Sequence, residues 1–184
     1  MLTGAGPLRP FARTGLILTL RNGPGSARVA ITAGLAMGLA MSLADATLFR
    51  PVVPAVQHVL AHEWSLTDRL ARFALGAVED ELVLRLGGLT LLLTMLVAWR
   101  GERTALIDGL AIGLTAAVLW PIWAYAYLGD LDWSGLTLAR EILLHIGAGS
   151  VWGWLFCRHG WMAGVLGHVS AHLMLQPLLP WVVS

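Results

Sequence analysis

The sequence predicts an all-α protein, a polytopic transmembrane helix bundle of about five spans. Hydrophobic residues make up 57% of the chain, charged residues only 12%, and the mean hydropathy is +0.73. A soluble domain carries about 25% charged residues, so this composition is typical of an integral membrane protein. With 184 residues, the chain is too short for a second large domain.

The expected elements follow from apolar runs of about 20 residues, the length that spans a bilayer. Residues 1–28, rich in Gly, Pro and Arg, predict an N-terminal loop with a short interfacial segment around residues 11–20. Residues 29–184 form the predicted bundle, with a partly amphipathic connection at residues 50–68 and a polar loop at residues 100–103. The spans are expected at residues 29–49, 69–99, 104–127, 136–156 and 161–183. Pro121 is expected to kink the third span.

The arginine positions predict an orientation in the cell (inner) membrane. With five spans, seven arginines fall on one side: Arg9, Arg13, Arg21, Arg28, Arg100, Arg103 and Arg158. The loop at residues 129–135, with two aspartates, falls on the other side. The positive-inside rule therefore predicts a cytoplasmic N-terminus and a C-terminus on the opposite side, although Arg50, Arg69 and Arg72 oppose this assignment.

Glycines recur four residues apart in four places: Gly34 and Gly38, Gly109 and Gly113, Gly149 and Gly153, Gly160 and Gly164. This spacing lets transmembrane helices approach closely. We expect it to serve packing within one bundle rather than dimerisation.

An acidic motif, Glu-Asp-Glu-Leu-Val-Leu-Arg at residues 79–85, lies inside the second predicted span. Ionised residues at membrane depth are costly, and they mark a functional site by default. Glu81 and Arg85 are four residues apart and can pair along one helix face. Asp80 points away from that face and is left without an obvious cation. Asp45 is expected to be satisfied near Arg50, at the end of the first span.

Three histidines are expected at a depth comparable with that of Asp80: His145 in the fourth span, and His168 and His172 in the fifth. His168 and His172 are four residues apart and share a helix face. Two imidazoles and a carboxylate at one depth suit metal ligation, or a general base with oxyanion donors. Alternatively, each polar group hydrogen-bonds another helix and fixes the packing.

Two motifs carry a family resemblance. Asp80, Glu81 and Arg85, followed by Gly87, are similar to a motif of two glutamates, three residues, arginine and glycine. Residues 149–172 are similar to a glycine-rich helix, a basic turn, and a histidine followed four residues later by asparagine, with His168 as the histidine and His172 at the asparagine position. Over roughly residues 70–175 the chain thus resembles the CAAX-protease and bacteriocin-processing (CPBP, or Abi) family of intramembrane proteases.

The middle motif of that family is a phenylalanine followed four residues later by a histidine. Spacing from the flanking motifs places it at residues 119–123, where Trp123 stands at the histidine position. The other placement, residues 141–145, supplies His145 but has Glu141 instead of phenylalanine. We prefer the first placement.

The resemblance implies a role for each site residue. In the family, the first glutamate and the middle histidine are thought to activate water, and the last histidine and asparagine to stabilise the oxyanion. It implies Asp80 as the base, Glu81 with Arg85 as an orienting pair, and His168 with His172 as oxyanion donors. His145 is the alternative for the missing histidine.

Three departures from the family pattern predict a diverged member. The base is shortened, the middle histidine is replaced and the asparagine is exchanged, and displacements of about 1 Å can cost ~100-fold in rate. The chain is expected to be either an intramembrane endopeptidase or a non-catalytic relative, needing no cofactor or metal. The alternatives are an accessory or scaffolding subunit, or binding of a haem or pigment through a membrane histidine. Expected partners are membrane lipids and a membrane-protein substrate or partner subunit, but no nucleic acid.

Overall fold

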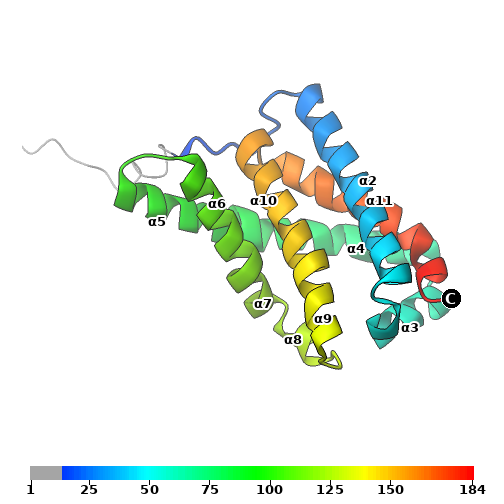
Figure 1. The fold of residues 1–184 in the computed structure, drawn as a ribbon. Helices are drawn as coiled ribbons and strands as arrows, with labels where there is room; N and C mark the ends of the chain where they lie inside the picture. Colours follow the sequence, from blue (N-terminus) through cyan, green and yellow to red (C-terminus); the bar gives the residue numbers. More distant parts are fainter. Residues whose placement is uncertain (1–13) are drawn as a thin grey trace, which may run out of the picture.

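The computed structural model describes residues 14–184, which form helices and their connections without any strand (Figure 1). The elements are α2 (Pro24–Thr47), the 3-10 turn η1 (Arg50–Val52), α3 (Ala55–Glu63), α4 (Leu66–Asp80), η2 (Glu81–Leu89), α5 (Thr90–Arg100), α6 (Ala105–Leu114), η3 (Thr115–Leu119), α7 (Trp120–Trp123), α8 (Tyr125–Gly129), α9 (Gly135–Arg140), η4 (Glu141–Ile146), α10 (Gly147–His159) and α11 (Trp161–Val182). The predicted all-α bundle is confirmed.

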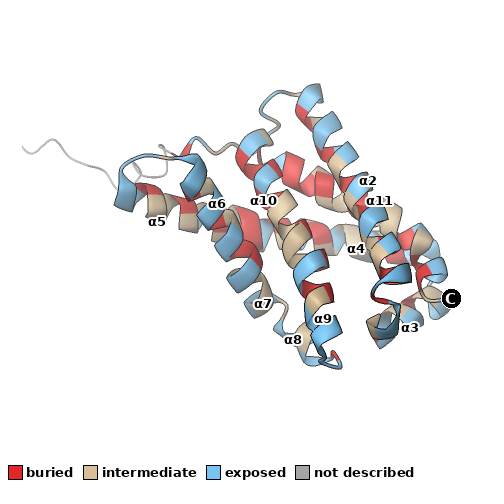
Figure 2. Cartoon of the chain, viewed as in Figure 1, coloured by how far each residue is buried: buried red, intermediate tan, exposed pale blue. Residues whose placement is uncertain are grey.

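Four of the described helices are long and apolar enough to cross a membrane: Pro24–Thr47, Leu66–Arg100, Ala105–Trp123 and Trp161–Val182. They match the first, second, third and fifth expected spans, and they support a membrane protein. Figure 2 shows that α5 and α6 are exposed along much of their length, and their exposed side chains include Leu91, Met95, Trp99, Leu106 and Leu110. Apolar side chains on the outer face are what a lipid environment favours.

The fourth expected span is also one continuous helical stretch, made of α9, η4 and α10. It is not among the four helices named above, and its buried residues include Arg140 and Glu141. The third span ends at Trp123 rather than at residue 127, because the backbone leaves the helical conformation at Ala124. The sequence alone did not locate either feature.

Three helices contain π-helical segments, η2, η3 and η4, and η3 packs against both of the others. The segment η3 ends just before Pro121. A proline ring has no N–H and clashes with the preceding turn, so the helix adjusts there instead of remaining regular. Segments of π-helix are rare and occur frequently at functional sites.

The helices α2 and α11, which come from opposite ends of the sequence, pack along each other (Figure 1). A Cβ atom on Gly34 would clash with the carbonyl oxygen of Gly167, and Gly38 makes a similar backbone approach. By contrast, a Cβ on Gly109 or Gly113 would meet no atom within 4 Å. The expected packing role therefore holds for the first glycine pair and not for the second.

Residues 15–21 form an irregular strap across the turn between α10 and α11. The backbone N–H groups of Trp161 and Met162 donate to the carbonyl oxygens of Ile17 and Leu18 at 3.0 and 3.2 Å. The strap thereby satisfies N–H groups that the first turn of a helix leaves free. The described part of the expected interfacial segment, residues 14–20, therefore contacts the helix bundle. Residues 1–13 lie outside the described residues. The first helix begins at Pro24, earlier than residue 29.

Arg103 makes several contacts at the same end of the molecule, although the sequence predicted only a polar loop there. Its guanidinium binds both carboxylate oxygens of Asp108, at 2.6 and 3.1 Å, and also donates to the carbonyl oxygens of Thr14 and Cys157. Burial alone would lower the pKa of Arg103, but the hydrogen bond and charge of Asp108 outweigh it and raise that pKa.

Candidate functional site

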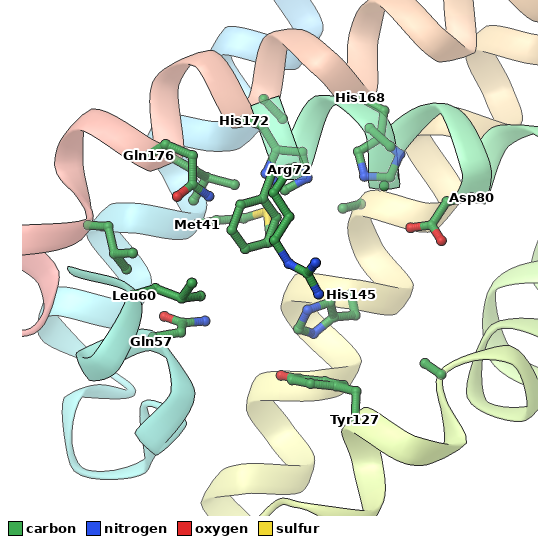
Figure 3. A pocket seen from close by; sticks show the side chains of 18 of the residues that line it. Met41, Gln57, Leu60, Arg72, Asp80, Tyr127, His145, His168, His172 and Gln176 are labelled. Carbon is green, nitrogen blue, oxygen red and sulfur yellow. The ribbon is translucent and has the colours of Figure 1, made fainter. Parts of the chain in front are cut away.

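A cavity of about 1110 Å³ lies between α2, α3, α4, the α7–α8 region, η4 with α10, and α11. Side chains from several of these elements surround it in Figure 3. Five of the six predicted site residues line it: Asp80, Arg85, His145, His168 and His172. The sixth, Glu81, is fully buried beside it. The structure therefore brings residues from three separate predicted spans to one place.

Glu81 is the centre of the buried part of the site. Its Oε1 lies 3.4 Å from Nη1 of Arg85 and 3.2 Å from Nδ1 of His168. The side chains of the Glu81–Arg85 ion pair are only 0% and 4% exposed, so the predicted pair is present and is shielded from solvent. A carboxylate at Nδ1 favours the tautomer with its proton there, leaving Nε2 of His168 as an acceptor.

The local sequence allows this centre to form. Arg85 donates from Nη2 to the carbonyl oxygen of Gly149 at 3.0 Å, and a Cβ on Gly149 would lie 3.4 Å from the same guanidinium. A Cβ on Gly164 would lie 2.7 Å from Oε2 of Glu81, an atom that has no hydrogen-bond partner within residues 14–184. The glycines in α10 and α11 thus leave room for an ion pair between helices.

The aromatic rings of Phe73, His172, His168 and Trp152 form one stacked row. Successive ring centroids lie 5.0, 5.3 and 5.4 Å apart. His168 and His172 therefore share a helix face, as their spacing predicts. Nδ1 of His172 is buried and has no hydrogen-bond partner in the described part of the chain. Stacking on both sides fixes the planes of the two imidazoles.

Asp80 has a partner that the sequence did not predict. Its Oδ1 accepts a hydrogen bond of 2.8 Å from the indole Nε1 of Trp123. No ion pair to Asp80 is formed among the described residues, in agreement with the expectation that it lacks a cation. An indole is a donor only, so it holds the carboxylate but cannot take up a proton.

A second buried charge cluster was missed by the sequence analysis. Arg140 binds both carboxylate oxygens of Asp45 at 2.8 Å and contacts Glu141 at 2.7 Å. The expectation that Asp45 is satisfied near Arg50 is wrong, because its partner comes from another helix and Arg50 is exposed. The sequence feature that could have predicted this cluster is the adjacent pair Arg140 and Glu141 inside an apolar span.

Tyr127 and His145 extend this cluster to the cavity. The Tyr127 hydroxyl lies 3.2 Å from both Nη1 of Arg140 and Oε1 of Glu141. Burial raises the pKa of Tyr127 to about 12, against the opposing effect of the Arg140 charge. Nδ1 of His145 lies 2.7 Å from Oε2 of Glu141, and the His145 ring stacks on that of Trp120 with ring centroids 4.9 Å apart.

No family model, curated protein or solved structure matches the chain. Within residues 14–184, no group of three His, Cys, Asp or Glu side chains is arranged to hold a metal ion. A function is therefore inferred from the cavity and its two charge clusters.

Proposed function

We propose that the protein is a diverged CPBP-like membrane protein that uses this cavity for binding and does not cleave peptide bonds. The observation that carries the proposal is the hydrogen bond between Asp80 and Trp123. These residues stand where the family has its water-activating carboxylate and, by spacing, its middle histidine. Their contact supports the resemblance, while the indole replaces the histidine, one of the two groups that activate water in the family, with a group that cannot accept a proton.

The rest of the site supports a binding role. The Glu81–Arg85–His168 centre is organised by contacts within the protein, and the stacked histidines form a rigid wall. The cavity volume of about 1110 Å³ lies slightly above the range of about 300–1,000 Å³ that is typical of ligand pockets in proteins. The proposed occupant is membrane-embedded, either a lipid or a segment of a partner subunit. A pigment bound through a histidine stays a prediction, which the visible absorption spectrum of the purified protein tests.

Peptidase assays on membrane-embedded peptides test the absence of cleavage. The purified wild-type protein should not cleave them, and Asp80→Asn should remain folded and retain the function of the protein in cells. Glu79→Gln is the matched control, because it removes a neighbouring carboxylate that is exposed. Cleavage by the wild type that is lost in Asp80→Asn and kept in Glu79→Gln would overturn the proposal.

The reverse substitutions examine the same site. Asp80→Glu combined with Trp123→His restores both residues that the family uses, so gain of cleavage by this double variant would support the proposed divergence. His145→Asn tests the alternative base: if the wild type cleaves and this variant does not, His145 has taken over the missing role and the binding proposal is wrong.

We further propose five crossings of the cell (inner) membrane, with Gly135–His159 as the fourth and the N-terminus in the cytoplasm. Arg140 and Glu141 are buried and form ion pairs. Pairing reduces the free-energy cost of ionised side chains at membrane depth, so a membrane crossing is compatible with these two residues. Reporters fused to the N-terminus and after Ser184 should lie on opposite sides of the membrane. Reporters on the same side would mean four crossings.

A further inference from the structure

One end of the cavity, formed by α3, the first turns of α4 and the last turns of α11, contains two polar groups that lack an ionic or hydrogen-bond partner within residues 14–184. Arg72 is exposed, lines the cavity and makes no ion pair among the described residues; its guanidinium lies over the ring of Trp64 at 5.9 Å. Gln176 also lines it, is 5% exposed, and its Oε1 has no hydrogen-bond partner in the described part of the chain. Figure 3 shows Arg72, His172 and Gln176 around the cavity, with the guanidinium of Arg72 extending toward His145 in this view.

No carboxylate forms an ion pair with Arg72 among the described residues. Asp68, four residues earlier, accepts a hydrogen bond from Ser65 at 2.6 Å. Glu79 and Asp80 lie seven and eight residues further along the helix, about 10 Å or more at ~1.5 Å per residue. Arg72 is therefore a cation available to a ligand at this end of the cavity.

The position of these groups suits a lipid headgroup. Arg72 lies six residues after the start of α4, and Gln176 six residues before the end of α11, so each is about 9 Å from a helix end. The headgroup regions of a bilayer flank a hydrocarbon core of about 30 Å, so a lipid bound toward these helix ends would present its headgroup to them. Apolar side chains line the cavity nearby: Met41, Leu60, Phe73, Leu175 and Leu179.

The unpartnered atoms define the ligand chemistry. The planar guanidinium of Arg72 matches the oxygens of a phosphate. The side-chain oxygen of Gln176 is an acceptor, so it requires a donor such as a hydroxyl group. We propose that this end of the cavity binds an anionic glycerophospholipid with a hydroxyl-bearing headgroup, its phosphate on Arg72, its hydroxyl on Gln176 and its acyl chain along the apolar wall.

This inference rests on the proposed function, because it assigns an occupant to a cavity that binds without cleaving. The two fail in different measurements. Cleavage of membrane peptides by the wild type would overturn the proposed function whatever lipid is bound. The lipid assignment is decided by lipid binding, which is measured without any cleavage assay.

The test compares lipid binding by purified variants in mild detergent, using the rise in melting temperature on addition of lipid and native mass spectrometry. Phosphatidylglycerol should stabilise the wild type, since a ligand of the folded state raises stability by mass action. Its apparent affinity should fall at least tenfold in Arg72→Gln and at least threefold in Gln176→Leu. Arg50→Gln is the matched control, because Arg50 is exposed and does not line the cavity, and it should bind as the wild type does.

Two further ligands identify what the site recognises. Phosphatidylcholine, which has a phosphate but no headgroup hydroxyl, should stabilise the wild type less than phosphatidylglycerol, and inorganic phosphate should not stabilise it. Equal responses to the two lipids, or unchanged binding of phosphatidylglycerol by Arg72→Gln, would overturn the assignment. Stabilisation by inorganic phosphate equal to that by lipid would show a free-phosphate site instead. If Gln176→Leu does not fold, the Arg72→Gln comparison decides.

Discussion

The guanidinium of Arg69 donates a hydrogen bond of 3.1 Å to the backbone carbonyl oxygen of Gln176, 107 residues later in the chain. That carbonyl is available because the residue four positions on is Pro180, which has no N–H to complete the helical hydrogen bond. The same guanidinium donates to the carbonyl oxygens of Leu60 and Trp64, near the end of α3. Arg69 therefore joins α3, α4 and α11 at one end of the cavity.

Replacing this arginine should be costly. We expect Arg69→Ala to lower the free energy of unfolding by about 3 kcal/mol, because buried carbonyl oxygens lose a charged donor. Thermal unfolding in detergent measures this, with the exposed Arg50→Ala as control. In a Pro180→Ala background the cost should be smaller, since the new N–H can bind the Gln176 carbonyl. The same cost in both backgrounds would contradict this account.

The Glu81–Arg85 pair gives a second prediction about stability. Arg85→Ala leaves the fully buried Glu81 carboxylate without its cation, and removing one partner of a buried pair costs about 3–5 kcal/mol. The melting temperature should therefore fall much further than in Arg158→Ala, whose arginine is exposed. Arg103→Ala is not a suitable control, because Arg103 is itself paired with Asp108. Equal melting temperatures for the Arg85 and Arg158 variants would show that the pair is unimportant for stability.

The turn at Gly160 should tolerate no side chain. Its φ of 97° favours glycine, and a Cβ there would also clash with the carbonyl oxygen of Thr19 in the strap. We expect Gly160→Ala to cost about 2 kcal/mol or more, because backbone strain and displacement of the strap add together. Gly101 also has a positive φ, 87°, but a Cβ there would meet no atom within 4 Å. We therefore expect Gly101→Ala to lower the free energy of unfolding by only about 1 kcal/mol. Thermal unfolding of the two variants checks the difference, and a smaller loss for Gly160→Ala would contradict it.

Tyr127 should make stability depend on pH in the alkaline range. Burial raises its pKa to about 12, whereas an unfolded tyrosine ionises near 10. The folded state holds this proton more tightly, so the stabilisation is complete below about pH 10 and is lost as pH rises toward 12. Melting temperatures between pH 9 and 12 should show this loss in the wild type and in Tyr125→Phe, in which Tyr127 is retained. Tyr127→Phe should lack this component, and an unchanged alkaline slope in that variant would contradict the prediction.

The sequence could predict contacts made within one helix. Hydropathy located the four apolar spans, and spacing of four residues identified the Glu81–Arg85 pair and the stacked His168 and His172. These contacts depend only on helical periodicity, which is a local property of the chain.

Contacts between helices could not be predicted in this way. Asp80 meets Trp123 43 residues away, and Asp45 meets Arg140 95 residues away. Spacing along one helix does not determine which face of another helix will oppose it. The same limit applies to glycines: the spacing is identical at Gly34 and Gly109, yet only the first is in contact with another backbone.

The pairing of α2 with α9 and α11 has a consequence for biosynthesis. The carboxylate of Asp45 is translated 95 residues before Arg140, its partner. At roughly 5–20 residues per second, this interval lasts on the order of 5–20 s. During that time Asp45 is unpaired, and the glycine face of α2 is not yet covered by α11. We therefore expect that membrane quality control recognises and degrades chains released from ribosomes that stall before α11 is synthesised.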